Sequence, residues 1–591
     1  PIDLKDLSDA KEIAIDLETC DPNLTTSGSG AINGNGFVVG IAVAVEGWQG
    51  YFPIAHEGGG NLDKRIILDW FQDILNTSAN KIFHNAMYDV SWIRAMGLNI
   101  NGRIIDTMIA GSLINENRFS YTLDSMGKEF VGFGKNETNL KEAAKNWNID
   151  PKKDMWRLPA MEVGSYAEKD AELTLKLWQR LQQELTAQDL WSVFTLETDL
   201  FPCLIDMKFK GVRVDMERAD TIKKEIVKKE KKTLLDIKKQ VGFDVEIWAA
   251  SSCALAFDKV NLPYDKTDKG NPSFTKNFLS THPHPLAKNI TLARELNKAH
   301  TTFIDTIIKH EHRGRIHADI NQIRSDQGGT VTGRFSYSNP NLQQVPARNK
   351  DLGPMIRSIF IPEEKCQWGC FDYSQQEPRI LVHYASLDNF RSVDSIIDKY
   401  KNSDADFHQS VADMADIERK QAKTINLGLM YGMGKNKLMA ELGLQVDAAE
   451  KLIKRYHASA PFVKQLMDSV SRRAQDSGRI RTIGGRVCHF DLWEPTTFGV
   501  HKSLPHAQAL REYGPGIKRA FTYKALNKLI QGSAADMTKT SMLALYKEGI
   551  VPHIQIHDEL DISVENPEQA SKIIEIMEQA IDLEVPNKVD Y

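Results

Sequence analysis

Two groups of acidic residues have the types and spacing that bind divalent cations. In the N-terminal part, Asp16 and Glu18 stand two residues apart at the end of a predicted strand, so their carboxylates share one face. Asp89 follows a later predicted strand, and Asp170 lies one helical turn after Tyr166. Clustered carboxylates repel one another unless cations neutralise them. Two Mg²⁺ ions about 4 Å apart would do so, activate a water and stabilise the leaving oxygen of a phosphodiester. Taken singly, each piece is also common in ordinary exposed turns and helices.

A second acidic pair lies in the C-terminal part. The segment WGCFDYSQQEPR (368–379) predicts a strand that ends at Asp372 and turns into a helix. The segment HIQIHDELDISV (553–564) alternates in polarity and predicts a hairpin with Asp558 and Glu559 at its turn. Acids at a hairpin tip favour a bound cation. Asp372 and Asp558 are therefore candidate ligands for two further Mg²⁺ ions, which would activate an attacking hydroxyl and neutralise a triphosphate during in-line attack.

Between these acids, RKQAKTINLGLMYG (419–432) predicts a helix with a stripe of functional residues. Arg419, Lys423, Leu427 and Tyr431 recur every four residues, so they stay on one side of the helix. This stripe is about 18 Å long, comparable with an extended nucleoside triphosphate. Cations at one end and an aromatic ring at the other would grip phosphates and pack against a base. For this helix alone, an amphipathic helix with a solvated basic end is the alternative interpretation.

The elements that position these residues fall into three regions. Residues 191–320 are predicted to be mostly helical, and residues 321–591 mix strands with long helices. Residues 1–190 mix strands and helices, with strands predicted at 13–16, 37–45, 50–54 and 81–84. A chain of 591 residues is too long for one core and predicts several domains.

Composition limits the class of protein. Hydrophobic residues make up 41% and charged residues 26% of the chain, as in ordinary globular proteins. No segment approaches the roughly 18 apolar residues of a membrane span, and the N-terminus lacks the layout of a secretory signal. Six scattered cysteines fit a reducing, cytoplasmic compartment. The formal net charge of −5 argues against nucleic-acid binding through overall basicity and leaves room for a local basic surface.

One local stretch is basic. Residues 207–240 contain twelve Lys or Arg and six Asp or Glu, and they read as one long helix. A solvated helix face and a surface that follows phosphates are both compatible with this pattern.

Taken together, the motifs resemble two known families. The three N-terminal acidic segments resemble the exonuclease motifs of the DEDD superfamily, in the variant with Tyr in the third motif. The segments around Asp372, 419–432 and Asp558 resemble motifs A, B and C of family A DNA polymerases. Further matching segments are GVRVD (211–215), TGRFSYSNPNLQQVP (332–346), RTIGGR (481–486) and NKLIQGSAADM (527–537). The resemblance covers nearly the whole chain.

The resemblance implies an α/β multidomain fold. An RNase H-like 3′→5′ exonuclease domain is expected at residues 1–190, followed by a right-hand polymerase. Its thumb is expected at 191–320 and its palm and fingers at 321–591, with the fingers at about 395–520. Residues 488–520 look like an insertion, expected to be a surface loop, with a DNA or partner contact as the alternative.

Site roles follow from the resemblance. In the exonuclease, Tyr166 would orient the attacking water, and the metal ligands would be Asp16, Glu18, Asp89 and Asp170. In the polymerase, Asp372 and Asp558 would be the catalytic metal ligands, with the Tyr373 carbonyl and Glu559 beside them. Glu377 would be the steric gate against a ribose 2′-OH, and Lys423 the general acid for pyrophosphate. The predicted dNTP-binding residues are Gln375, Glu377, His408, Arg419, Lys423, Leu427 and Tyr431. The predicted DNA contacts are Arg334, Asn341, Gln344, Asn527, Gln531 and His557.

Three positions depart from the family pattern. Leu427 stands where Phe or Tyr is usual, which predicts discrimination against dideoxynucleotides. Gln376 and Pro378 flank Glu377 where the family usually has Ile and Leu. Tyr523 replaces a common Arg, and Lys524 lies beside it.

The expected protein is a proofreading, template-directed DNA polymerase that extends a primer 3′-OH for DNA replication. Its expected partners are primer–template DNA, dNTPs and single-stranded 3′ ends. Two Mg²⁺ ions are expected in each active site, and Mn²⁺ is expected to be able to substitute for them. We expect a monomer without a 5′-nuclease domain or a thioredoxin-binding insertion, similar to bacteriophage replicative enzymes and located in the host cytoplasm. The alternatives are an exonuclease whose polymerase-like half only grips DNA, and a non-catalytic replication scaffold. The presence of Asp372, Asp558, Arg419 and Lys423 argues against both.

Overall fold

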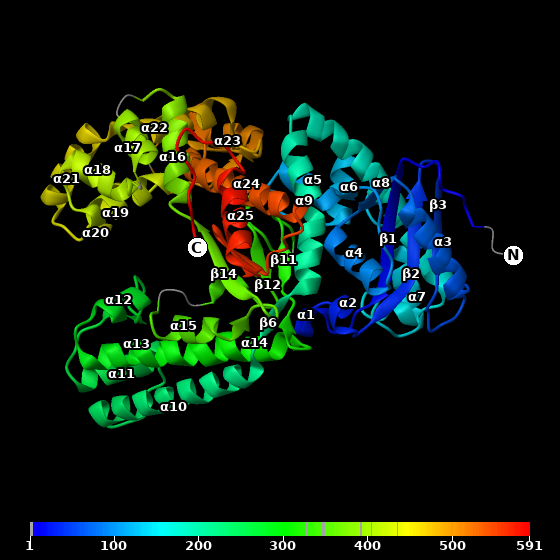
Figure 1. Cartoon of the computed structure of the whole chain (residues 1–591), viewed down its shortest axis with the longest axis horizontal. Helices are drawn as coiled ribbons and strands as arrows, with labels where there is room; N and C mark the ends of the chain where they lie inside the picture. Colours follow the sequence, from blue (N-terminus) through cyan, green and yellow to red (C-terminus); the bar gives the residue numbers. More distant parts are fainter. Residues whose placement is uncertain are drawn as a thin grey trace. The chain divides into compact units, whose positions relative to one another are not determined.

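The chain forms two compact units in the computed structural model (Figure 1), which describes residues 4–591 except 327, 346–348, 391–392, 404, 434 and 498. The first unit comprises Pro1–Phe209, Ile320–Tyr337 and Gly369–Tyr591. The second comprises Lys210–Asp319 and Ser338–Trp368. The boundary that we predicted at residues 190/191 therefore does not coincide with a boundary between these units. Residues 346–348, at the end of the predicted TGR segment, lie outside the described residues.

The N-terminal part of the first unit is built on a mixed five-stranded sheet. Its order is β3-β2-β1-β4-β5, and its strands are β1 (Glu12–Cys20), β2 (Phe37–Val45), β3 (Trp48–Pro53), β4 (Asn80–Phe83) and β5 (Ile104–Asp106). Strands β2 and β3 run antiparallel to β1 and to each other, whereas β4 and β5 are parallel to β1. The four predicted strands are all present, with ends shifted by a few residues. Most of β2 is buried, which explains its continuous apolar run.

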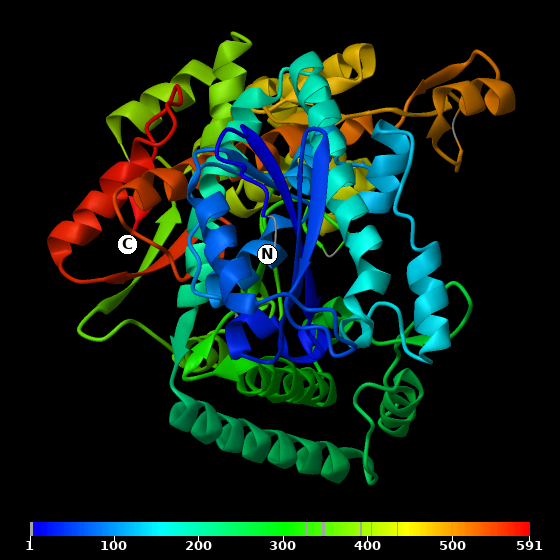
Figure 2. The same ribbon diagram turned by 90° about the vertical axis from the view of Figure 1, so that its right-hand side faces the viewer.

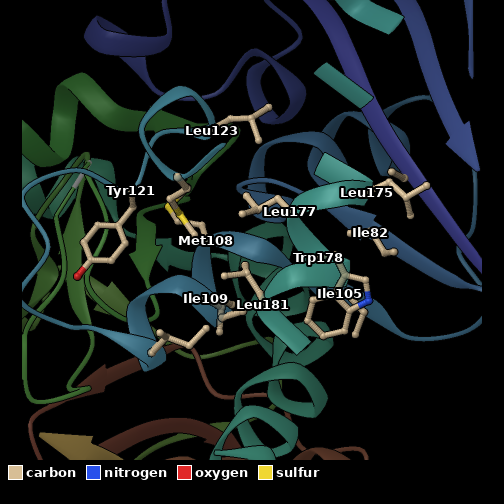
Figure 3. Packing of buried hydrophobic residues seen from close by; sticks show 14 of the residues in the cluster. Ile82, Ile105, Met108, Ile109, Tyr121, Leu123, Leu175, Leu177, Trp178 and Leu181 are labelled. Atoms are coloured by element: carbon tan, nitrogen blue, oxygen red, sulfur yellow. The ribbon is translucent and has the colours of Figure 1, made fainter. Parts of the chain in front are cut away.

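Helices cover both faces of this sheet. The long helix α8 (Ala160–Ala187) packs across β1, β2 and β3, and α5 (Thr107–Ile114) and α6 (Leu123–Phe130) pack beside it. Figure 3 shows Trp178 of α8 beside Ile105 of the sheet, and Leu181 of α8 beside Ile109 of α5. On the other face, α3 (Lys64–Asn76) and α4 (Ala86–Ala95) contribute to a second cluster. Strand β1 alternates accordingly, with Ala14 in the first cluster and Ile13 and Ile15 in the second.

The second unit is mainly helical. Figure 1 shows α10 (Met216–Val241) and α13 (Pro285–Lys298) side by side, and α11 (Ala250–Lys259) adds to their core. The prediction of one helix over 207–240 is wrong. Helix α9 (Trp191–Lys210) ends before β6 (Val212–Val214), and α10 begins after it. Gly211 makes the break with φ +59°, and a Cβ at this position would lie 2.5 Å from the Ile316 carbonyl oxygen.

A second sheet of the first unit carries the C-terminal acids. Its order is β20-β21-β14-β22, and its strands are β14 (Gln367–Tyr373), β20 (Ile554–Ile556), β21 (Glu559–Val564) and β22 (Val589–Asp590). Helices α24 (Ala525–Lys547) and α25 (Pro567–Glu578) pack together beside it, and the Tyr373 hydroxyl is hydrogen-bonded to Ser541 of α24. The predicted hairpin is present, but its turn is formed by His557 and Asp558, because Glu559 already belongs to β21.

The helices between residues 394 and 477 belong to the predicted fingers and gather in one group in Figure 1. They are α17 (Asp394–Asn402), α18 (Phe407–Ala415), α19 (Arg419–Met430), α20 (Lys435–Glu441), α21 (Val446–Ser459) and α22 (Pro461–Ser477). Among the described residues, no helix combines the length and apolarity needed to cross a membrane.

The segment expected to be a surface loop at 488–520 is instead folded. It contains β17 (Leu492–Pro495), β18 (Leu504–Pro505), α23 (His506–Tyr513) and β19 (Ile517–Arg519), with β17 between the other two strands. Figure 2 shows these elements as a small orange lobe. The Trp493 ring lies 4.6 Å from the His506 ring, between centroids, and its centroid lies 4.7 Å from Cζ of Arg519. These contacts join β17, α23 and β19 within the lobe.

Candidate active sites

The predicted exonuclease residues line one cleft of about 940 Å³. Asp16 and Glu18 come from β1, Asp89 from α4, and Tyr166 and Asp170 from α8. Carboxylate oxygens of Asp16, Glu18 and Asp170 lie within 4.8 Å of one another. Asp89 is fixed beside β1 because its Oδ1 accepts a 2.9 Å hydrogen bond from the backbone N–H of Leu17. The tertiary structure thus brings together residues that are up to 154 positions apart in the sequence.

The electrostatics of this cleft fit bound divalent cations. The pKa of Asp16 is raised to about 7, mainly by burial and to a smaller extent by repulsion from Asp170. Burial is also the main reason why the pKa values of Glu18, Asp89 and Asp170 are raised. Moreover, Asp170 Oδ1 is buried without a hydrogen-bond partner. A site with buried, mutually repelling oxygen donors suits hard cations such as Mg²⁺.

Lys135 is a cleft residue that sequence reasoning missed. Its ammonium is ion-paired with Asp170 and donates a 3.0 Å hydrogen bond to the Tyr166 hydroxyl. Burial by itself would lower the pKa of Lys135, but Asp170, Tyr166 and Asp16 raise it well above the ordinary value. Lys135 lies in a loop between α6 and α7 (Thr138–Asn146), where no local periodicity marks it.

The second acidic site lies on the C-terminal sheet. Asp372 is near the end of β14, and the Tyr373 N–H donates a 3.2 Å hydrogen bond to the Asp558 carbonyl in the hairpin turn. The pKa of Asp372 is raised to about 7, mainly by burial and to a smaller extent by the charges of Asp558, Glu559 and Asp590. The pKa of Asp558 is also raised, mainly by burial. These carboxylates fit divalent cations for the same reason as the first group. Asp590, opposite Asp372 on β22, was not predicted.

Glu377 links two further predicted residues. It lies in the first turn of α16 (Gln376–Leu387), forms an ion pair with Arg334 and accepts a 3.2 Å hydrogen bond from the Tyr431 hydroxyl. Burial, followed by the Glu377 carboxylate, raises the pKa of Tyr431 to about 12. Arg334, Glu377 and Tyr431 therefore meet at one point, as a shared role in binding would require.

Helix α19 presents its predicted stripe outward. Arg419 and Lys423 are exposed and Leu427 is half-buried, whereas Ile425 and Leu429 on the opposite side are buried. The Arg419 guanidinium binds Asp406 Oδ2 through two hydrogen bonds of 2.9 and 2.6 Å. The capping residue Glu418 and its partner Gln421 form a capping box that fixes the start of the helix.

Comparison with known proteins assigns the chain to a family. Residues 216–591 match the model of DNA polymerase family A, and residues 4–186 match that of a 3′-5′ exonuclease. The chain belongs to DNA polymerase family A. It is a DNA-directed DNA polymerase with a 3′-5′ exonuclease domain at its N-terminal end, and the predicted family and fold class are confirmed.

Relatives from bacteriophages and bacteria support this assignment. The DNA-directed DNA polymerase of Pseudomonas phage M6 is 35% identical, over 98% of this chain and 93% of its own length. DNA polymerase DpoZ of Acinetobacter phage SH-Ab 15497 is 30% identical over 89% of each chain. DNA polymerase I of Pseudomonas aeruginosa is 28% identical, over 99% of this chain and 63% of its own length.

The fold is shared with a solved polymerase structure. The POL domain of Pol1 from M. smegmatis, in complex with DNA primer-template and dNTP, superimposes with a TM-score of 0.78. The alignment covers 99% of this chain and 95% of that one, at 22% identity.

In this polymerase, the side chain of Gln375 has structural partners. Its Oε1 accepts hydrogen bonds from the Phe407 N–H (2.8 Å) and the Tyr400 hydroxyl (3.1 Å), and its Nε2 donates to the Ala405 carbonyl (2.9 Å). Gln375 thus ties the segment before α18 to the start of α16. Its predicted contact with a dNTP stays a prediction.

The predicted DNA contacts are divided between the two units. Asn527 and Gln531 are half-buried and one turn apart on α24, and His557 forms the hairpin turn with φ +58°. Asn341 and Gln344 belong to the second unit, where the Asn341 side chain accepts a 3.1 Å hydrogen bond from the Gln343 N–H. Their roles in DNA binding stay predictions.

Proposed function

We propose that this family A polymerase replicates DNA by extending primer 3′ ends with dNTPs at Asp372 and Asp558 and proofreads them at the exonuclease cleft. The observation that carries the proposal is the presence of two separate groups of carboxylates in one chain, one mostly buried and one mostly half-buried. In both groups burial and mutual repulsion raise carboxylate pKa values, to about 7 for Asp16 and Asp372. Concentrated oxygen donors of this kind suit hard divalent cations, which would neutralise their mutual repulsion.

Two Mg²⁺ ions per site, replaceable by Mn²⁺, are the proposed cofactors. When bound, they neutralise phosphate charge and lower the pKa of the attacking hydroxyl or water. Asp372 and Asp558 would hold them in the polymerase site, with the Tyr373 carbonyl and Glu559 nearby. In the exonuclease the ligands would be Asp16, Glu18, Asp89 and Asp170.

The remaining polymerase residues act on the nucleotide. Arg419, Lys423 and His408 would bind the triphosphate, and Lys423 would protonate the departing pyrophosphate. Glu377 would exclude a ribose 2′-OH by its size, and Tyr431 would lie beside the templating base. The ion pair with Arg334 and the hydrogen bond from Tyr431 hold the Glu377 carboxylate in one place, as a steric gate requires.

In the exonuclease cleft, the Tyr166 hydroxyl would orient the attacking water. Lys135 holds this hydroxyl through a 3.0 Å hydrogen bond. Lys128, Lys141 and Lys152 also line the cleft and would attract the phosphates of a single-stranded 3′ end.

The proposed partners are primer–template DNA, dNTPs and single-stranded 3′ ends, with the protein acting as a monomer in the host cytoplasm. The DNA would be contacted by Arg334, Asn341, Gln344, Asn527, Gln531 and His557. The similarity to a polymerase whose structure contains DNA primer-template and dNTP supports this proposal.

One primer with a mismatched 3′ end tests both sites. With Mg²⁺ alone, we expect trimming, and with Mg²⁺ and dNTPs we expect excision followed by full extension. Asp372→Asn should reduce extension at least about 10³-fold and leave trimming intact, whereas Asp16→Asn should do the reverse. Trimming without extension by the unaltered protein would refute the polymerase assignment and favour an exonuclease with a non-catalytic polymerase-like half.

A further inference from the structure

Three side chains form a buried hydrogen-bonded chain behind the proposed triphosphate site. They are His408 of α18, Asn426 of α19 and Tyr456 of α21. Asn426 Nδ2 lies 3.0 Å from His408 Nδ1, and the Tyr456 hydroxyl is hydrogen-bonded to Asn426 Oδ1. Asn426 and Tyr456 are fully buried, and His408 is 8% exposed. These residues are 18 and 30 positions apart, so only the packing of the helices brings them together.

The hydroxyl of Tyr456 fixes which way the Asn426 amide points. Because this hydroxyl is buried, its hydrogen needs an acceptor, and Asn426 Oδ1 is the one it meets. The other end of the amide, Nδ2, then points at His408 Nδ1 as a donor. Rotating the amide by 180° would leave the hydroxyl hydrogen facing an N–H group.

This orientation determines the tautomer of His408. An imidazole nitrogen that accepts a hydrogen bond carries no proton, so Nδ1 is the acceptor and the proton is on Nε2. The ring is also neutral near pH 7, because burial lowers the pKa of His408 to about 4. The carboxylate of Asp406 opposes this shift, whereas the charges of Lys423 and Arg419 add to it. His408 therefore offers a neutral N–H donor close to the two cations of α19.

We propose that Asn426 and Tyr456 are positioning residues that hold His408 as its Nε2–H tautomer, so that it donates a hydrogen bond to a phosphate oxygen of the incoming nucleotide. The inference rests on the proposed function, in which His408 binds the triphosphate. The opposite tautomer would turn a lone pair towards a phosphate oxygen, and the two acceptors would repel each other. Asn426 and Tyr456 thus act on nucleotide affinity through His408, without touching the nucleotide.

The first test is kinetic. In the full-length protein, Asn426→Leu combined with Tyr456→Phe replaces both polar groups by apolar groups of similar shape, which leaves no unpaired donor. We expect the KM for a correct dNTP to rise about tenfold with little change in kcat, because one phosphate contact is weakened. His408→Ala provides the second background, in which the same pair of substitutions should have no further effect on KM. An equal loss of dNTP affinity in both backgrounds would mean a purely structural role and would overturn the proposal.

The second test reads the tautomer directly and does not depend on polymerase activity. In protein labelled with ¹⁵N-histidine, the His408 signals are those missing from His408→Gln. We expect an unprotonated Nδ1 and a protonated Nε2 at neutral pH, and a mixture of tautomers in the Asn426→Leu/Tyr456→Phe variant. Tyr456→Phe alone, which frees the amide to rotate, is the milder variant should the double one fail to fold. A proton on Nδ1 in the unaltered protein would overturn the inference, whereas absence of extension with the expected tautomer would refute only the proposed function.

Discussion

The Tyr431 hydroxyl donates a hydrogen bond of 3.2 Å to the Glu377 carboxylate. This bond joins the end of α19 to the first turn of α16, and the same carboxylate is ion-paired with Arg334. A side chain held from two sides cannot swing away from a bulky ligand. A residue that excludes a ribose 2′-OH needs this property.

Glu377→Ala should therefore weaken sugar selection. We expect the preference for dNTPs over rNTPs to fall at least about tenfold, because space opens for the 2′-OH. Glu377→Gln is the matched control, since it keeps the size of the side chain and removes its charge. Single-nucleotide kcat/KM values for dATP and rATP measure the effect. Retained selectivity in Glu377→Ala would disprove the steric role, and an equal loss in Glu377→Gln would show that charge matters more than size.

Leu427 should make the enzyme discriminate against dideoxynucleotides. The residue is half-buried on the exposed stripe of α19 and has neither a ring nor a hydroxyl. No polar group at this position would compensate for a missing 3′-OH, so we expect ddNTPs to be incorporated at least about tenfold less efficiently than dNTPs.

Leu427→Tyr, which adds a hydroxyl, should reduce this preference, and Leu427→Met, which adds none, should leave it unchanged. Competition between ddNTP and dNTP on one template measures both variants. Equal incorporation of the two nucleotides by the unaltered enzyme would contradict the prediction.

The stability of the metal-free protein should depend on the charge of Asp16. The folded protein raises the pKa of Asp16 from 3.8 to about 7, so between these values the folded state binds a proton that the unfolded state has released. The free energy of unfolding therefore falls as pH rises through this window. Asp16→Asn removes this dependence. In EDTA we expect the variant to exceed the unaltered protein in Tm by a few degrees at about pH 8, and by much less at about pH 5.

Mg²⁺ should reverse this difference, because a bound cation favours the charged carboxylate. The Tm of the unaltered protein should rise with added Mg²⁺ more at about pH 8 than at about pH 6, since protons compete with the metal at the lower pH. In EDTA, the Tm of Asp16→Asn could differ from that of the unaltered protein by the same amount at about pH 5 and about pH 8. This result would show that Asp16 does not titrate between these pH values.

Glu116 should stabilise the junction between the exonuclease and polymerase parts of the chain. Its buried carboxylate accepts hydrogen bonds from the His489 N–H (2.8 Å) and contacts His489 Nδ1 (2.7 Å) and Lys528 Nζ (3.5 Å). Glu116→Ala leaves these groups buried without their acceptor, so we expect a loss of about 3 kcal/mol in the free energy of unfolding.

Urea unfolding of the full chain measures this loss. Glu548→Ala is a suitable control, because it removes a half-exposed partner of Lys572 and should leave stability nearly unchanged. Equal effects of the two substitutions would mean that the Glu116 contacts contribute no more than a surface ion pair.

The amino-acid sequence by itself determined the chemical groups of both sites and the local elements that carry them. Asp16 and Asp372 lie in strands, and Asp558 follows one, and the apolar patterns of these strands are visible in ten or fewer residues. The stripe of α19 follows from helical periodicity. Such signals are local, and they survive without knowledge of the neighbours. The same local reasoning failed at Gly211, where a positive φ and close contact with a distant strand interrupt a helical pattern. It also failed in the 488–520 lobe, where β17 pairs with β18 and β19, which lie further along the chain.

The tertiary structure decided which groups meet. Lys135 reaches Asp170 from a loop without periodicity, Asp590 comes to Asp372 from the end of the chain, and Asn426 meets His408 and Tyr456 only because three helices pack together. The raised pKa values have the same origin, since burial and nearby charges depend on residues far away in the sequence. Residue types and spacing therefore predict what chemistry is available, whereas the packing of distant segments sets the protonation state, orientation and partners of each group.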